Sequence, residues 1–212
     1  MGGRQEGRNV IITHRGHTPS IDPTATVATT AVVSGEVTVG PGARILDGAV
    51  VTSEDGTVTI GEDVVIMEHA LVKARAGHNV TIGAATLVGP HAHVNGASVG
   101  SSCFIATGAS LFPGSRLGEG VEVRIGGVVQ VNTWLDDGAT VPIHWVAVGR
   151  PAVILPPERH DEIWGIQRGL DFMGTVYGVD RGTPMSELMR EQSAWYQAHD
   201  DDEVAGQEAI AP

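Results

Sequence analysis

Four histidines that could bind a metal ion lie close together in the first half of the chain: His69, His78, His91 and His93. Neutral imidazole is a common ligand for zinc and for other divalent transition metals. A zinc ion held by three protein side chains keeps a position for water and lowers the pKa of that water to about 7. The four histidines therefore predict a site for zinc or another divalent metal.

Two other interpretations of these histidines stay open. Surface or interface histidines make ordinary hydrogen bonds, and a histidine without a metal can act as a general base because its pKa is near neutral. The types and spacing of the residues fit all three interpretations. The choice depends on the elements that position the side chains.

A six-residue repeat positions these histidines. Aliphatic residues recur every six positions, with two short insertions and one step of five, at Ile21, Val27, Val33, Val39, Ile45, Val51, Ile60, Ile66, Val72, Ile82, Val88, Val94, Val99, Ile105, Leu111, Leu117, Val123, Val129, Leu135 and Val141. A strand alone repeats every two residues and a helix every 3.6, so a period of six indicates short strands joined by corners. Three strands make one coil, and coils stack about 4.8 Å apart. The repeat predicts an all-β core that folds as a parallel β-helix.

The register of the repeat predicts which side chains meet. Ile66 and Val88 are three units apart, which places them on the same side of adjacent coils. His69 lies three positions after Ile66, and His91 lies three positions after Val88. The two histidine side chains are therefore predicted to stack at strand spacing. His91 and His93 are predicted to face outward from one strand, and His78 to lie on an insertion. The aliphatic residues of the repeat form a ladder, and a glycine directly follows five of them: Gly40, Gly61, Gly83, Gly100 and Gly118. These glycines are predicted to lie at corners that leave little room for a side chain and need unusual dihedrals.

Three segments resemble the hexapeptide-repeat proteins, specifically the γ-class carbonic anhydrase-like family: "IDPTATVATTAVVSGEVTVGPGARI", "VTIGEDVVIMEHALV" and "VTIGAATLVGPHAHVNGASVG". This resemblance covers roughly residues 18–155. It implies a left-handed β-helix, a homotrimer with active sites between subunits, and a zinc ion bound by three histidines.

The resemblance also implies a changed site. The three zinc-ligand positions of the family fall here on Lys73, Pro90 and Asn95, and none of these replaces imidazole in the ordinary way. Glu54, Asp55 and Glu68 keep acidic character near the expected site. Glu68, Lys73 and Asn95 are therefore the candidate catalytic residues, although a salt bridge between Lys73 and Glu68 is an alternative role for the lysine.

The repeat divides the chain into four parts. We expect an N-terminal arm over residues 1–17, the β-helix over 18–155, a helical segment over 156–199 and a disordered acidic tail over 200–212. Apolar residues recur on one face of residues 158–172 and of 184–199, which predicts two amphipathic helices packed along the β-helix or against a neighbouring subunit.

Composition limits the partners. A formal charge of −12 with only 13 Lys and Arg residues argues against binding of nucleic acid. No apolar run reaches the roughly 20 residues that span a membrane, and the N-terminus lacks an apolar signal run. The single cysteine, Cys103, rules out an intramolecular disulfide framework and is compatible with a reducing compartment. We expect a cytoplasmic protein with a small-molecule substrate.

Three functions are consistent with these features. The first is a divergent carbonic anhydrase-like hydratase or lyase that acts on a small carbonyl or carboxyl substrate with a relocated metal. The second is an acyl-CoA transferase with a histidine as base and the cofactor in the groove between coils. The third is a non-catalytic structural trimer. Bound metal distinguishes the first function from the other two.

Overall fold

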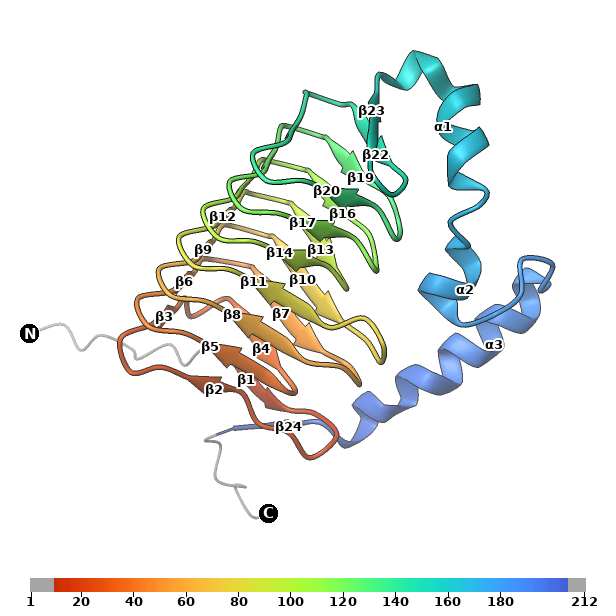
Figure 1. The fold of residues 1–212 in the computed structure, drawn as a ribbon. Helices are drawn as coiled ribbons and strands as arrows, with labels where there is room; N and C mark the ends of the chain where they lie inside the picture. The colour runs from red at the N-terminus through yellow and green to blue at the C-terminus, as the bar shows by residue number, and fades with distance from the viewer. Residues whose placement is uncertain (1–9, 206–212) are drawn as a thin grey trace, which may run out of the picture.

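A solenoid of stacked coils forms most of the computed structural model, which describes residues 10–205 (Figure 1). Each coil adds one strand to each of three sheets. Three α-helices then return along one side of the coils: α1 (His160–Gln167), α2 (Phe172–Tyr177) and α3 (Met185–Tyr196). The predicted all-β core, a parallel β-helix with C-terminal helices, is confirmed.

The three sheets differ in length. The first sheet contains β1 (Val10–Thr13), β4 (Val32–Ser34), β7 (Val50–Ser53), β10 (Leu71–Ala74), β13 (His93–Asn95), β16 (Ser110–Leu111), β19 (Val128–Val129), β22 (Val146–Val148), β23 (Val153–Leu155) and β24 (Glu203–Val204). The second contains β2 (Ser20–Ile21), β5 (Val37–Val39), β8 (Val58–Ile60), β11 (Val80–Ile82), β14 (Ser98–Val99), β17 (Arg116–Leu117) and β20 (Trp134–Leu135). The third contains β3 (Thr26–Val27), β6 (Arg44–Ile45), β9 (Val65–Ile66), β12 (Leu87–Val88), β15 (Phe104–Ile105), β18 (Glu122–Val123) and β21 (Thr140–Val141).

The inward aliphatic residues form the predicted ladder. In the third sheet Ile45 pairs with Ile66, Ile66 with Val88, and Val88 with Ile105. All four side chains are at most 1% exposed. Burial of apolar surface contributes roughly 25 cal/mol per Å², so this continuous column is the main source of stability. The register predicted from the period of six is confirmed.

Glycines close the corners in a way that differs from the prediction. Gly83 and Gly100 have ordinary backbone dihedrals, but a Cβ on Gly83 would lie 2.5 Å from the amide nitrogen of Ser101 in the next coil. These glycines are therefore required for close approach between coils and not for unusual dihedrals. Positive φ angles occur instead at another set of corner positions, which includes Gly48 at +68° and His69 at 57°.

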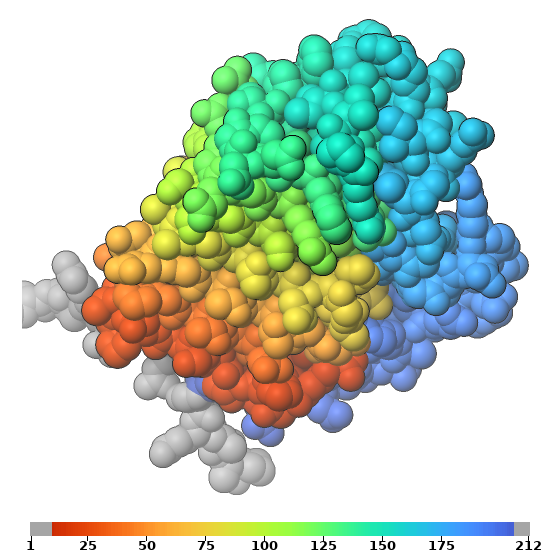
Figure 2. All heavy atoms as spheres, viewed as in Figure 1, coloured from red at the N-terminus to blue at the C-terminus, as the bar shows by residue number. Residues whose placement is uncertain are grey.

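The C-terminal helices cover one side of the solenoid (Figure 2). The helix predicted over residues 158–172 is present as α1, which ends earlier, at Gln167. A separate helix, α2, begins after Asp171, whose φ is 52° and whose carboxylate accepts a hydrogen bond from the Gly174 amide. The helix predicted over 184–199 is confirmed as α3, and a 3₁₀ turn, η2 (Gln197–Asp201), follows it. Another 3₁₀ turn, η1 (Pro157–Arg159), precedes α1. No helix within residues 10–205 is long and apolar enough to cross a membrane.

Both ends of the described chain join the first sheet, which corrects the expected arm and tail. Val10–Thr13 form β1, which pairs with β4, so part of the expected arm belongs to the solenoid. Glu203–Val204 form β24, which pairs antiparallel with β1 and covers the exposed edge of the sheet. Residues 1–9 of the expected arm and 206–212 of the expected tail lie outside the described residues.

Adjacent residues of β8 test the register. Ile60 is 1% exposed, whereas Thr59 faces solvent. Because Ile60→Asp buries a carboxylate without a partner, we expect it to cost more than about 4 kcal/mol and to abolish cooperative unfolding. Thr59→Asp should cost less than about 1 kcal/mol. Thermal unfolding followed by circular dichroism measures both, and equal tolerance of the two substitutions would contradict the register.

Candidate metal centre

The predicted stack of His69 and His91 is present, at a corner between the third and first sheets. Their ring centroids lie 5.2 Å apart with an interplanar angle of 13°. Both residues have positive φ, 57° and 56°, and both are exposed. Histidine is enriched in this left-handed region relative to most residues, so the turn itself explains these two side chains. His91 therefore lies in the turn before β13. The prediction that His91 and His93 share one strand is wrong.

His78 and His93 lie away from this stack, one in the turn after β10 and the other on β13. His93 projects from β13 against the edge of the Phe112 ring, with centroids 6.0 Å apart. His78 follows β10 at the opposite corner and forms an isolated bridge with Arg75. Burial lowers the pKa of both histidines, and a nearby cation, Lys73 for His93 and Arg75 for His78, lowers it further. Within residues 10–205 the four predicted ligands do not converge on one point.

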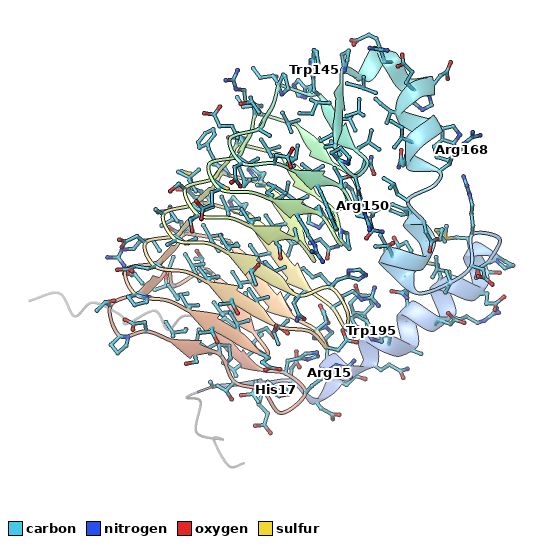
Figure 3. The ribbon with its side chains drawn as sticks, in the orientation of Figure 1. Arg15, His17, Trp145, Arg150, Arg168 and Trp195 are labelled. Carbon is cyan, nitrogen blue, oxygen red and sulfur yellow. The ribbon has the colours of Figure 1, made fainter. Side chains whose placement is uncertain are left out.

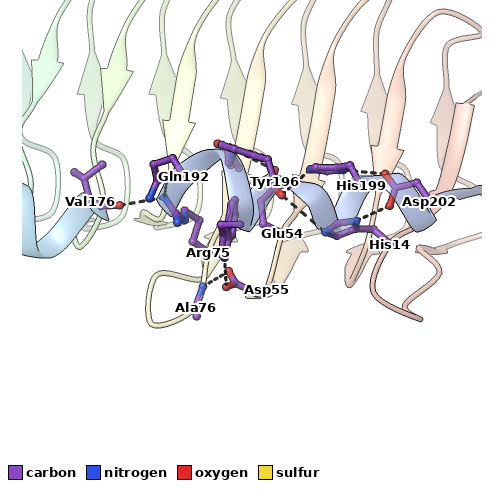
Figure 4. Close-up of polar contacts among 12 residues, drawn as sticks. His14, Glu54, Asp55, Arg75, Ala76, Val176, Gln192, Tyr196, His199 and Asp202 are labelled. Carbon is purple, nitrogen blue, oxygen red and sulfur yellow. Dashed lines mark hydrogen bonds and ion pairs between the residues drawn. The ribbon is translucent and has the colours of Figure 1, made fainter. Parts of the chain in front are cut away.

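Another group converges where the C-terminal segment meets the first coils. The group consists of His14, His199 and Asp202, and one ligand atom of each lies within 4.8 Å of the other two. Within residues 10–205 no other three His, Cys, Asp or Glu side chains come this close. The two imidazoles stack with centroids 4.4 Å apart. His14 Nδ1 lies 2.6 Å from Asp202 Oδ1, and His199 Nδ1 lies 2.9 Å from Asp202 Oδ2 (Figure 4). One carboxylate thus bridges both rings.

A second carboxylate faces the opposite edge of the rings. Glu54 Oε2 lies 2.9 Å from His199 Nε2 and 3.8 Å from His14 Nε2. Glu54 is only 5% exposed. His14 Nε2 is buried and has no hydrogen-bond partner among the described residues. The pair of rings is therefore enclosed by two carboxylates, and one ring nitrogen remains available to a further ligand.

The fold brings these four residues together from distant parts of the sequence. His14 follows β1 and Glu54 follows β7, so both lie at the corner where the first sheet ends. The helix α3 is held to this corner because Trp195 Nε1 donates a hydrogen bond to Asp55 Oδ2 and the Arg75 guanidinium lies 4.0 Å from the Trp195 ring. His199 follows in η2, and the pairing of β24 with β1 fixes the chain beyond Asp202.

The surroundings of His199 and Asp202 shift their pKa values in opposite directions. Burial lowers the pKa of His199, but hydrogen bonds and negative charge from Asp202 and Glu54 outweigh burial and raise it above the ordinary value. Burial raises the pKa of Asp202, but hydrogen bonds from His199 and His14 and their positive charge outweigh this and lower it. A metal ion would replace the shared protons as the positive charge between these groups.

The donor set fits a divalent transition metal. Two imidazoles and a carboxylate are typical ligands of catalytic zinc and of non-haem iron. Glu54, whose Oε2 lies near Nε2 of both rings, adds a second carboxylate beside the imidazoles. A cavity of about 200 Å³ lies beside the cluster, and the residues that line it include His14, Arg15, Glu36 and Glu54. Figure 3 shows Arg15, His17 and Trp195 together at this end of the solenoid.

The comparisons with known proteins point to one superfamily of folds. No family model matches the chain. It is 30% identical over 151 residues to "Gamma carbonic anhydrase 1, mitochondrial" of Arabidopsis thaliana, covering 68% of this chain and 53% of that protein. It is 37% identical over 99 residues to "Bifunctional protein GlmU" of Herminiimonas arsenicoxydans, covering 47% of this chain and 20% of that protein.

The solved structures support the same fold. A putative acetyltransferase of Bacillus cereus superposes with a TM-score of 0.53 and 20% identity, covering 78% of this chain and 94% of that chain. The chain is a γ-carbonic anhydrase-like hexapeptide-repeat protein. It spans at most about half the length of the two curated relatives described above, 53% and 20%.

The residues that the resemblance places at the family's zinc-ligand positions have protein partners or lie on the sheet. Lys73 and Asn95 pair in register on adjacent strands of the first sheet. Lys73 Nζ lies 2.9 Å from Glu54 Oε1 and donates a hydrogen bond of 2.9 Å to Tyr196 Oη, so its partner is Glu54 and not the predicted Glu68. Asn95 Oδ1 is buried without a partner among the described residues. Glu68 is half-buried beside His69 in the turn before β10.

Sequence reasoning missed His14, His199 and Asp202 for an identifiable reason. The sequence places His14 in an expected arm and Asp202 in an expected disordered tail, and 188 positions separate the two residues. Their only local signal is the pair His199 and Asp202, three residues apart in an acidic segment. The register does indicate that His14 and Glu54 share a corner, once β1 is counted as the first strand of the solenoid.

Removal of Glu54 tests the electrostatics of the cluster in chelator-treated protein. The Glu54 and Lys73 side chains are 4% and 17% exposed, so Glu54→Gln leaves Lys73 charged in a partly buried site. We expect a loss of about 3–5 kcal/mol in the free energy of unfolding by urea. Glu162→Gln removes the partner of Arg159 from an exposed ion pair and should cost at most about 1 kcal/mol. Equal small losses would contradict a buried ionic network.

Proposed function

We propose that this protein binds one divalent metal ion through His14, His199 and Asp202 and acts as a hydratase or lyase on a small carbonyl or carboxyl substrate. The observation that carries the proposal is the convergence of two stacked imidazoles and a carboxylate beside a buried, unpartnered nitrogen of His14. The likeness to a relative named as a γ-carbonic anhydrase supports the class of reaction. When bound, such a metal supplies a water of lowered pKa as nucleophile and polarises a carbonyl oxygen.

The surrounding residues have defined roles in this proposal. Glu54 accepts a hydrogen bond from His199 Nε2 and is held by Lys73, so it orients the imidazole and can hold a proton next to the cavity. Arg15 lines the same cavity and provides positive charge for a carboxylate substrate. Lys73 and Asn95 act in this proposal by supporting Glu54 and the sheet face, and not as metal ligands.

Metal content per chain tests the proposal directly. We expect about one zinc, iron or other transition metal per chain by inductively coupled plasma mass spectrometry on protein purified without chelator. The double substitution His14→Gln, His199→Gln should remove the metal and the hydration of carbon dioxide or related carbonyl chemistry. The matched control is His69→Gln, His91→Gln, which removes a stacked pair of exposed imidazoles and should keep both metal and activity.

Three results contradict the proposal. Metal lost only in the His69 and His91 variant would assign the site to the corner stack. Metal retained in both variants would require other ligands. Protein that remains metal-free after incubation with zinc or ferrous iron would remove metal chemistry and leave acyl transfer from CoA or a structural role. Because Asp202→Asn keeps side-chain volume, its expected loss of metal affinity, at least about tenfold, separates ligation from misfolding.

We also propose that the protein is a homotrimer. An apolar groove of about 560 Å³ lies on the third sheet, with Phe104, Ile125 and Ile143 between 45% and 53% exposed. Exposed apolar side chains grouped in this way are typical of protein interfaces. The γ-carbonic anhydrase-like family, to which the chain belongs, is expected to form trimers, and a second copy of the chain is the occupant that fits this groove.

The assembly is tested by mass. We expect size-exclusion chromatography with light scattering to give three times the chain mass of 22.1 kDa for the unmodified protein. Ile125→Glu should shift the mass toward one chain, because a carboxylate would be buried at the interface. Met185→Glu alters an exposed apolar residue at the start of α3, outside the groove, and should leave the mass unchanged. A monomeric unmodified protein would contradict the proposal.

A further inference from the structure

A second polar pocket lies at the corner between the first and second sheets, further along the solenoid. Its volume is about 360 Å³, and its lining includes His78, Asn79, Arg116, Trp134 and Arg150. None of its lining residues is acidic, although the chain has 25 Asp and Glu residues and only 13 Lys and Arg. It shares no lining residue with the cavity beside His14 and Glu54.

Trp134 organises the two arginines of this pocket. Arg116 and Trp134 are register partners on β17 and β20, and the Arg116 guanidinium carbon lies 4.8 Å from the centre of the Trp134 ring. The Arg150 guanidinium carbon lies 5.3 Å from the same ring. Stacking on an aromatic ring fixes the orientation of a guanidinium and leaves its N–H donors free for another partner.

The arginines have few partners within the protein. Arg150 Nε donates a hydrogen bond to the Asn132 carbonyl oxygen. Among residues 10–205 no carboxylate lies within 4.0 Å of either guanidinium, and no hydrogen bond involves the guanidinium of Arg116. Two like charges held around one ring repel each other, and an anion between them would remove that repulsion.

The remaining walls suit a small ligand. Gly96 and Gly114 form part of the lining with φ of +55° and +76°, and a Cβ on Gly114 would lie 2.3 Å from Asn132 Oδ1. Ser115 also lines the pocket, and its Oγ is buried without a partner among the described residues. His78 and Asn79 bring nitrogen donors from the preceding coils. The pocket therefore combines cationic and neutral donors around a glycine-lined wall.

We propose that Arg116 and Arg150, together with His78, form a binding site for a small molecule that carries a phosphate or carboxylate group, separate from the proposed metal centre. Guanidinium groups bind both anions through paired hydrogen bonds, so the two ligand chemistries share the same recognition. The site requires no metal and no contribution from His14, His199 or Asp202.

Calorimetric titration of the full chain at low ionic strength tests this site with two probes, inorganic phosphate and malonate. We expect at least one probe to bind with a Kd below the millimolar range. Arg116→Gln and Arg150→Gln should each weaken that binding about tenfold or more, because each removes a charged donor. Arg190→Gln changes the net charge equally at an exposed position of α3 outside this pocket, so it should leave the Kd unchanged.

The outcomes are distinct. Binding of phosphate alone identifies a phosphate ester as the ligand class, and binding of malonate alone identifies a carboxylate. Absence of binding by both probes overturns the proposal, and so does an equal loss in all three variants, which would indicate only general electrostatic attraction. Binding that is insensitive to Arg116 and Arg150 but lost in the His14→Gln, His199→Gln variant would place the anion at the metal centre and also overturn it. Circular dichroism of each variant verifies that the fold is retained.

Discussion

The stacking of one aliphatic residue on the next along the solenoid is the interaction on which the rest of the structure depends. Ile45, Ile66, Val88 and Ile105 form one such column, and each is almost completely excluded from water. A strand of two or three residues forms too few hydrogen bonds to be stable alone, so each coil is stable only on its neighbour. Register errors would turn inward side chains outward, and the column therefore fixes every corner position along the chain.

A fixed register turns residues that are far apart in sequence into neighbours along one edge. The corner after the first sheet begins with His14, continues through Glu54 and His78, and ends with Arg150. Its first coils carry carboxylates and imidazoles beside Arg15 and Arg75, and its last coil carries Arg150. The proposed metal centre and the proposed anion site therefore lie along the same edge. The helix α3 supplies Trp195 to this edge, and the segment after α3 supplies His199 and Asp202.

Lys73 supplies a fixed positive charge next to a buried carboxylate of the cluster. Its ammonium group pairs with buried Glu54 and with Tyr196 on α3. Opposite charges in contact reduce the cost of burying the Glu54 carboxylate. The same Glu54 also faces His14 and His199. The lysine and the imidazole pair are therefore linked through one carboxylate.

The sequence by itself determined the solenoid, because a period of six in aliphatic residues has no other simple structural explanation. The sequence also determined which residues of adjacent coils pair, including the stack of His69 on His91, because the register follows from the six-residue spacing. It could not show that these two histidines occupy left-handed turn positions, which depend on backbone dihedrals at a corner. Only the tertiary structure decided that His14, His199 and Asp202 meet, because β24 pairs with β1 across nearly the whole length of the chain. A contact of that kind depends on how the C-terminal helices return along the coils, and no local pattern of residues encodes that path.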